Sequence, residues 1–179
     1  IERDLDLIAP LAARRLAVAY ITITTLDAEL ARRLEPRAAS PARRLRTIAT
    51  LTAHGVPVGV SVAPQIPCIN DDMEQVLEAA WSAGARSAFY TVLRLPWEVA
   101  PLFREWLSLH YPDRAQRVMA RVQEMRGGKD YNSSFATRMK GSGAWADLIA
   151  QRFARASRKL GFNQVRVELD VTAFRPPGV

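Results

Sequence analysis

This sequence has few side chains that could bind a metal. Its 179 residues include one cysteine, Cys68, and two histidines, His54 and His110. A single cysteine excludes an internal disulfide framework, because a disulfide needs two thiols. Zinc and iron-sulfur sites use several thiolate or imidazole ligands, so these side chains are too few for a dedicated metal centre. We therefore expect no metal ligands in this chain.

Long apolar runs are also absent. No segment approaches the roughly 20 apolar residues that a transmembrane helix needs. The first residues (IERDLDLIAP) have the pattern of an amphipathic helix, without an initiator methionine and without the basic and then apolar pattern of a signal segment. We expect a cytoplasmic protein with no membrane partner, and a natural start upstream of Ile1.

Acidic residues are fewer than basic ones. The chain has 25 Lys and Arg against 18 Asp and Glu, which gives a net charge of +7. Such an excess suits a polyanionic partner, such as nucleic acid or a phosphorylated ligand. It is also typical of solvated helix faces when arginine is spread along helices, as it is here. The second interpretation is favoured, and the charge alone assigns no partner.

Strand-like and helix-like segments alternate through the first 112 residues. Three segments of strand length are apolar and rich in β-branched residues, as buried parallel strands are: 16–25 (LAVAYITITT), 56–64 (VPVGVSVAP) and 87–95 (SAFYTVLRL). Helical patterns follow these segments, and crossover helices between parallel strands produce such an alternation. We predict a right-handed parallel βα array, either open or barrel-like.

Capping signals place the helices between these strands. Ser40 followed by Pro41 predicts a helix start, with serine as the N-cap and proline at the first helical position. Asp71 with Glu74 three residues later predicts a capping box for the next helix. Four tryptophans fall mostly at core spacing on helix faces and are interpreted as packing residues: Trp81, Trp97, Trp106 and Trp145.

The pattern changes after residue 112. Two further helical patterns are separated by the polar loop KDYNSSFATRMKGSG, whose glycines do not match a phosphate-binding P-loop. Residues 165–171 alternate strictly between apolar and polar side chains, which predicts a half-buried edge strand before an irregular tail at 174–178. We divide the chain into βα units at 1–112 and a mostly helical C-terminal extension with a final strand at 113–179.

The ligand site of a parallel array lies at the carboxyl ends of its strands. Thr22 and Thr24 at the first of these ends can hydrogen-bond ribose or carboxylate oxygens, or satisfy local backbone groups. Arg94 ends a strand that is otherwise apolar, so its guanidinium needs either an anionic ligand or an ion pair, for which Glu98 is the candidate. These residues alone indicate a ligand edge but no reaction.

Long strings of the sequence resemble one enzyme family. Those in the first part are ITITTLDAELARRLEPRAASPARRL, GVPVGVSVAPQIPCIND and LRLPWEVAPLFREWL, which resemble the second half of the radical S-adenosylmethionine (SAM) domain in bacterial proteins similar to spore photoproduct lyase, a DNA repair photolyase-like subgroup. The strings RGGKDYNSSFATRM and AWADLIAQRFARASRKLGFN resemble the C-terminal extension of that subgroup. The resemblance implies an α/β fold, namely the C-terminal part of a partial (βα)6 TIM-like barrel. It also implies a 4Fe-4S cluster that reductively cleaves SAM to a 5′-deoxyadenosyl radical, which abstracts hydrogen from a substrate.

The resemblance also assigns the cofactor-binding residues, which all lie at strand ends. Thr22 and Thr24 match positions that contact the ribose or the methionyl part of SAM. The turn after the second strand flanks the adenine, mainly through backbone and apolar contacts, and the last strand approaches the adenine or the substrate. The residues matched there are Ala63, Pro64, Ile66 and Asn70 in the turn, and Arg94 and Leu95 on the last strand. No catalytic residue is assigned.

Four positions depart from the family pattern. Thr22 stands where serine is expected and keeps the hydroxyl, whereas Cys68 stands where glycine is expected and is interpreted as a thiol without a function. In the polar loop, Asn132 is more usually Asp and Ala136 more usually Gly, so the resemblance assigns that loop no catalytic role.

The largest departure is the absence of the CxxxCxxC loop that holds the cluster in this family. We therefore expect the cluster ligands and three of six strands in a missing N-terminal half, and the chain alone to be inactive. An exposed parallel edge favours pairing with another copy, so we predict a homo-oligomer for the isolated chain. The substrate class that the resemblance suggests is nucleic acid. The alternative function is a non-catalytic, basic nucleic-acid-binding module, which a cysteine triad upstream would exclude.

Overall fold

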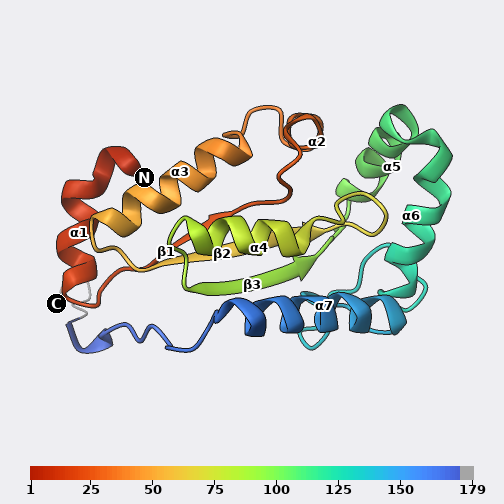
Figure 1. Cartoon of the computed structure of the whole chain (residues 1–179). Coiled ribbons are helices and arrows are strands. Elements are labelled where there is room, and N and C mark those ends of the chain that lie inside the picture. The colour runs from red at the N-terminus through yellow and green to blue at the C-terminus, as the bar shows by residue number, and fades with distance from the viewer. Residues whose placement is uncertain (174–179) are drawn as a thin grey trace, which may run out of the picture.

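A three-stranded parallel sheet forms the centre of the computed structural model, which describes residues 1–173 (Figure 1). Its strands pair in the order β1-β2-β3, with β1 at Ala19–Thr22, β2 at Val58–Gln65 and β3 at Ser87–Val92. The helices are α1 (Leu5–Ala13), α2 (Ala28–Leu34), α3 (Pro41–Ala53), α4 (Met73–Ser82), α5 (Val99–His110), α6 (Pro112–Glu124) and α7 (Ala144–Leu160). The predicted α/β fold with three parallel strands is confirmed.

Local signals in the sequence set several helix ends. The Asp27 carboxylate accepts hydrogen bonds from the backbone N–H groups of Glu29 and Leu30 at the start of α2, at 2.8 and 3.1 Å. Ser40 caps α3 in the predicted way, with Pro41 as the first helical residue. Gly161 ends α7 in a left-handed conformation that glycine adopts without steric cost. These caps fix where the chain enters and leaves the layer of helices.

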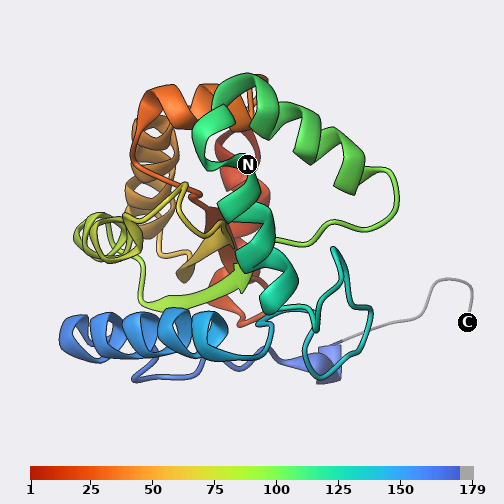
Figure 2. The same cartoon turned by 90° about the vertical axis from the view of Figure 1, so that its right-hand side faces the viewer.

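The two faces of the sheet have different surroundings. On one face Val58, Val60 and Val62 of β2 belong to a core that also contains buried residues of α3, α4 and α7. Figure 2 views the strands from their carboxyl ends and shows these helices in an arc on one side of the sheet. The ring of Tyr90 on β3 contacts Phe153 of α7 on this covered face, with a centroid separation of 4.8 Å.

The opposite face, which we name the open face, carries Tyr20, Thr22, Gly59, Ser61 and Phe89. The strand register places these residues side by side on β1, β2 and β3. Tyr20 and Phe89 are 46% and 41% exposed, and their rings pack at 5.3 Å. Sequential strand order with α3, α4 and α7 on one face defines a singly wound sheet, whereas a doubly wound sheet carries helices on both faces.

A second apolar core lies beyond the carboxyl ends of the strands. The helices α5 and α6 pack together there, against Ile66 of the turn after β2 and Leu95 of the segment after β3. The indole N–H of Trp106 donates to the Arg33 carbonyl oxygen at 3.0 Å, which ties α5 to α2. The α5–α6 pair therefore flanks the edge at which a ligand site is predicted (Figure 1).

The predicted final strand at 165–171 is wrong. Residues 165–170 form no strand, and Val171–Ala173 is a single 3-10 turn. Val165 and Val171 are each 78% exposed, so the alternation does not bury an apolar face. A strand also needs a neighbour with free backbone groups, and this segment instead meets the end of α1, where the Asp170 N–H donates to the Arg15 carbonyl oxygen at 2.9 Å. The predicted irregular tail at 174–178 lies outside the described residues.

The prediction that Trp97 packs in a core is wrong. Trp97 is 85% exposed, because the helix begins only at Val99 and leaves this indole in the preceding turn. Trp81, Trp106 and Trp145 do pack against the two cores. Across residues 1–173, every helix is too short or too polar to cross a membrane.

Neighbouring aromatic residues on β3 test which face of the sheet is covered. Tyr90→Ala removes a side chain that is 4% exposed, so it should lower the free energy of unfolding by about 3 kcal/mol or more. Phe89→Ala should cost only about 1 kcal/mol, because Phe89 lies on the open face. Urea unfolding followed by circular dichroism compares the two, and equal losses would contradict the assignment of faces.

Candidate functional site

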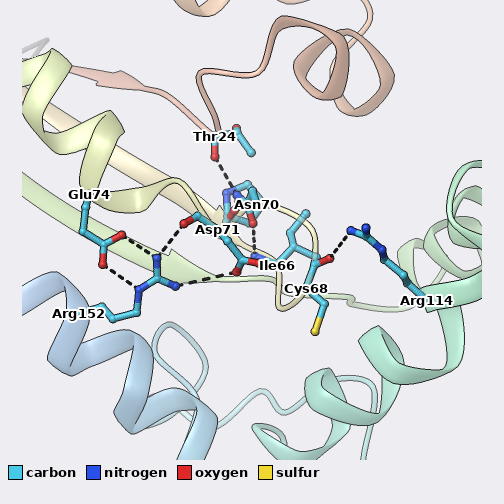
Figure 3. Close-up of polar contacts among 9 residues, drawn as sticks. Thr24, Ile66, Cys68, Asn70, Asp71, Glu74, Arg114 and Arg152 are labelled. Atoms are coloured by element: carbon cyan, nitrogen blue, oxygen red, sulfur yellow. Dashed lines mark hydrogen bonds and ion pairs between the residues drawn. The ribbon is translucent and has the colours of Figure 1, made fainter.

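The carboxyl ends of β1 and β2 are joined by the amide of Asn70, which is 4% exposed. Its nitrogen donates to the carbonyl oxygens of Thr24, at 2.8 Å, and Pro64, at 2.9 Å. Its oxygen accepts the Ile66 N–H at 2.7 Å (Figure 3). This one side chain therefore fixes both the turn after β2 and the position of the segment after β1.

Thr24 adds a second link between the same strands. Its hydroxyl donates to the Ala63 carbonyl oxygen at 2.9 Å and lies 3.1 Å from a carboxylate oxygen of Glu35. Glu35 also pairs with Arg44 at 3.2 Å. A threonine hydroxyl has one proton, and here acceptors within the protein surround it. Thr24, 3% exposed, therefore holds the strand ends together.

The carboxylate of Asp72 holds the turn that leaves β1. One of its oxygens accepts from the Thr25 hydroxyl at 2.9 Å and from the Leu26 N–H at 2.6 Å. The Thr25 hydroxyl in turn accepts the Asp27 N–H at 3.1 Å. Asp72 precedes α4 but makes no side-chain cap to it. Its role is to connect the start of α4 to the end of β1.

The predicted capping box of Asp71 and Glu74 is wrong. The Glu74 carboxylate instead pairs with Arg152 of α7, which donates to both of its oxygens at 2.8 and 2.6 Å (Figure 3). Arg152 also donates to the Asp71 carbonyl oxygen at 2.8 Å. These hydrogen bonds lower the pKa of Glu74 below its ordinary value. Arg152, which is distant in sequence, thus binds the Glu74 carboxylate that the local pattern predicts to cap α4.

Thr22 lies apart from this network on the open face, where it is exposed. The backbone of Thr22 is held, because Arg44 donates to its carbonyl oxygen at 2.7 Å. The neighbouring positions on β2 that share the face are occupied by small residues, Gly59 and Ser61. The Thr22 hydroxyl is therefore presented beside a strand that carries no bulky side chain on this face.

At the end of β3, Arg94 is half-buried and makes contacts only with neutral groups among the described residues. Its guanidinium donates to the Tyr131 hydroxyl at 3.2 Å and approaches the Met139 sulfur at 3.7 Å. Neither Glu98 nor another carboxylate of residues 1–173 pairs with it. Of the two alternatives in the sequence analysis, the ion pair with Glu98 is not formed.

Arg126 lies beside Arg94 and is 1% exposed. Its guanidinium donates to the carbonyl oxygens of Leu93, Thr137 and Arg138, at 2.6, 3.1 and 2.9 Å. Burial and, next, the charge of Arg94 lower the pKa of Arg126 from its ordinary value. Arg126 thus clamps the loop before α7 onto the end of β3.

The structure brings most of the sequence-predicted site residues to one edge. Thr24, Ala63, Pro64, Ile66 and Asn70 form one hydrogen-bonded unit. Ile66 and Leu95 are 2% and 1% exposed in the second core, so their side chains are not accessible to a ligand at this edge.

Sequence reasoning missed four residues of this edge: Glu35, Asp72, Arg126 and Tyr131. Asp72 follows the predicted cap by one position, and Arg126 stands directly before the glycine pair that ends α6. Nothing in the local pattern indicates that these side chains reach a strand end.

Cys68 occupies a backbone conformation that favours glycine. Its φ is +63°, in the left-handed region, and its carbonyl oxygen accepts from Arg114 at 3.4 Å (Figure 3). A glycine at this position would avoid the steric cost of the positive φ. Within residues 1–173, no group of three or more His, Cys, Asp or Glu side chains is placed to hold a metal ion.

Among the curated proteins similar to this chain are an uncharacterized protein of Mycobacterium bovis and uncharacterized proteins of two strains of Mycobacterium tuberculosis. Each is 30% identical over 120 residues, which cover 65% of this chain and 35% of the relative. The chain thus spans about a third of the length of the curated relatives it matches. No protein-family model matches the chain. No solved structure matches it significantly.

Replacement of Asn70 by aspartate tests the link between the strand ends. Asn70→Asp keeps the acceptor for Ile66 but loses both donors and places a charge against two carbonyl oxygens, so the free energy of unfolding should fall by about 3 kcal/mol at neutral pH. The deficit should shrink as the pH is lowered, because a protonated carboxyl regains a donor. Chemical unfolding of the variant and the unmodified chain at several pH values measures this loss in the free energy of unfolding.

Asn132→Asp is the matched control, because the Asn132 side chain accepts a hydrogen bond from the Ser134 N–H and keeps that acceptor as aspartate. Its expected effect is below about 0.5 kcal/mol. Equal losses in the two variants would contradict the role given to Asn70.

The left-handed position of Cys68 gives a separate test. Cys68→Gly should be more stable than Cys68→Ala by roughly 0.5 to 1 kcal/mol, because alanine keeps the steric cost of the positive φ. Thermal unfolding of the two variants under identical conditions measures the difference. A more stable alanine variant would contradict this backbone assignment.

Proposed function

We propose that this chain provides the last three βα units of a radical SAM enzyme, built as a partial (βα)6 barrel, and that its strand ends help to bind SAM. The observation that carries the proposal is the singly wound sheet with one covered and one open face. In a βα barrel the helices lie outside and the other face of the sheet points inward. The open face with Tyr20, Thr22 and Phe89 corresponds to that interior.

The length of the relatives is consistent with this proposal. The chain spans 35% of each, which leaves room for further βα units in a protein of that length. Such units would add strands to the free edge of β1 and cover the aromatic pair on the open face. We propose an N-terminal half of the same protein as the occupant, acting in the cytoplasm.

The residues of this chain do not fit a 4Fe-4S cluster. Such clusters use several cysteine ligands, and Cys68 is the one cysteine of the sequence. The ligands would have to come from the rest of the protein.

One exposed side chain supports SAM binding at the strand ends. Thr22 presents an exposed hydroxyl toward the open face, beside the small residues Gly59 and Ser61. Hydroxyls of this kind hydrogen-bond ribose or carboxylate oxygens. In enzymes of this class, SAM supplies the hydrogen-abstracting radical when it is bound beside a reduced cluster. The contribution of this chain is to bind and orient the cofactor.

Other assigned residues would position the site rather than touch SAM with their side chains. The Asn70 amide and the Thr24 hydroxyl are engaged within the protein, so they fix the backbone of the turn after β2. Ala63 and Pro64 form the end of β2 itself, and they would face the adenine through backbone and apolar contacts. Thr22 is thus the side chain expected to affect cofactor affinity directly.

The test is SAM cleavage by the protein in its complete reading frame, after anaerobic reconstitution with iron and sulfide. Thr22→Val should raise the KM for SAM about tenfold with little change in kcat, because one hydrogen bond to the bound cofactor is lost. Formation of 5′-deoxyadenosine, measured by liquid chromatography, gives both constants.

Thr52→Val is the matched control, because Thr52 is exposed at the end of α3, close to Gly84, away from the carboxyl ends of the strands. Its KM for SAM should equal that of the unmodified protein. Absence of SAM cleavage by the reconstituted protein would overturn the proposed function. Equal KM values in the two variants would overturn the role of Thr22.

A further inference from the structure

Two guanidinium groups lie together at the end of β3 without a carboxylate partner among the described residues. Arg126 is buried on carbonyl oxygens, and Arg94 contacts a tyrosine hydroxyl and a thioether sulfur. The Nε atoms of both arginines are buried and have no acceptor within residues 1–173. A buried cation without a counter-charge is costly, so this pair favours the approach of an anion.

The two arginines have different roles at this place. Arg126 is 1% exposed and its two terminal nitrogens donate to backbone carbonyl oxygens, so it contributes positive potential but no direct contact. Arg94 is half-buried, and its guanidinium has five N–H groups. Its two contacts, with the Tyr131 hydroxyl and the Met139 sulfur, leave further N–H groups for a ligand. Arg94 therefore has both the access and the donors to bind an anion.

Tyr131 supplies a second donor next to Arg94. Its hydroxyl oxygen accepts from Arg94 at 3.2 Å, which leaves the hydroxyl proton to donate elsewhere. Tyr131 is also half-buried and comes from the loop that Arg126 clamps to β3. N–H and O–H donors from two segments distant in sequence thus converge at the edge of the sheet.

We propose that Arg94 and Tyr131, supported by the charge of Arg126, bind a phosphate group at the carboxyl end of β3. A guanidinium matches two oxygens of a phosphate in its planar fork, and a tyrosine hydroxyl serves a third. Two adjacent cations without a carboxylate partner among residues 1–173 favour a phosphate monoester, which carries up to two negative charges, over a singly charged carboxylate. A phosphodiester of a nucleic-acid strand carries one charge, and its oxygens match the guanidinium fork in the same way. The phosphate belongs either to a small phosphorylated molecule or to a nucleic-acid strand.

This inference goes beyond the proposed function, because the site would bind phosphate with or without SAM. It also differs from a P-loop, which the glycines of the polar loop do not match, since it uses side chains rather than glycine backbone groups. The loop contributes the Tyr131 side chain to the site. Arg126 holds this loop in place through hydrogen bonds to the carbonyl oxygens of Thr137 and Arg138.

The test is calorimetric titration of this chain with inorganic phosphate at low salt, in the absence of SAM. Arg94→Gln should weaken phosphate binding about tenfold and Tyr131→Phe about threefold. Arg94→Lys should fall between Arg94→Gln and the unmodified chain, because it keeps the charge but loses the planar fork. The matched control is Arg117→Gln, which removes the same charge from an exposed position on α6 and should leave phosphate binding unchanged.

A second titration distinguishes the sources of the phosphate. A short fluorescent single-stranded DNA is titrated into the same variants, and its anisotropy is followed at several salt concentrations. Binding that weakens in Arg94→Gln, with a salt slope reduced by about one, supports a nucleic-acid strand. Loss of inorganic phosphate binding in Arg94→Gln with DNA binding equal to that of Arg117→Gln supports a small phosphorylated molecule.

Two results would overturn the proposal. One is the absence of phosphate binding by the unmodified chain, and the other is equal phosphate binding by Arg94→Gln and Arg117→Gln. Thermal unfolding of each variant shows that it is folded, and Arg94→Lys provides the comparison if Arg94→Gln is not. Neither result depends on SAM cleavage, so failure of this site and failure of the proposed function are distinguishable.

Discussion

Backbone groups at the end of a parallel strand need new partners once the ladder stops, and in this protein the Asn70 amide supplies several of them. It satisfies carbonyl oxygens of Thr24 and Pro64 and the N–H of Ile66, so that β1, β2 and the turn between β2 and α4 are held in one arrangement. Each of these groups is costly to leave unpaired when buried. The positions of the Thr24 hydroxyl and of the turn that leads into α4 depend on that arrangement.

The same edge explains how the helices are placed around the sheet. Asp72 ties the start of α4 to the turn after β1, and Arg152 ties α7 to the carboxylate of Glu74. These contacts gather the helices on the covered face, where the valines of β2 are buried. The open face keeps Tyr20 and Phe89 partly exposed. A sheet covered on one side in this way is what the proposed assembly with further βα units requires.

The sequence predicts the three strands and the cap at Ser40 well, and it predicts the capping box at Asp71 and the long-range contacts poorly. Apolar β-branched runs mark β1, β2 and β3, and Ser40 with Pro41 marks the start of α3, because these signals are local. The alternation at 165–171 misleads because a period of two says nothing about a neighbouring strand. Among the site residues, strand ends indicate Asn70 and Arg94. The clamp formed by Arg126 depends on a loop that folds back onto β3, and no local pattern encodes that contact.

We propose that this chain is one part of a SAM-binding barrel whose cluster ligands lie in another part. The most direct test is the content of iron and acid-labile sulfide in the anaerobically prepared protein, read together with its complete reading frame. We expect a cysteine triad with CxxxCxxC spacing upstream of Ile1, and about four irons and four sulfides per molecule of the complete protein. A complete reading frame without such a triad, yielding a protein free of iron, would contradict it.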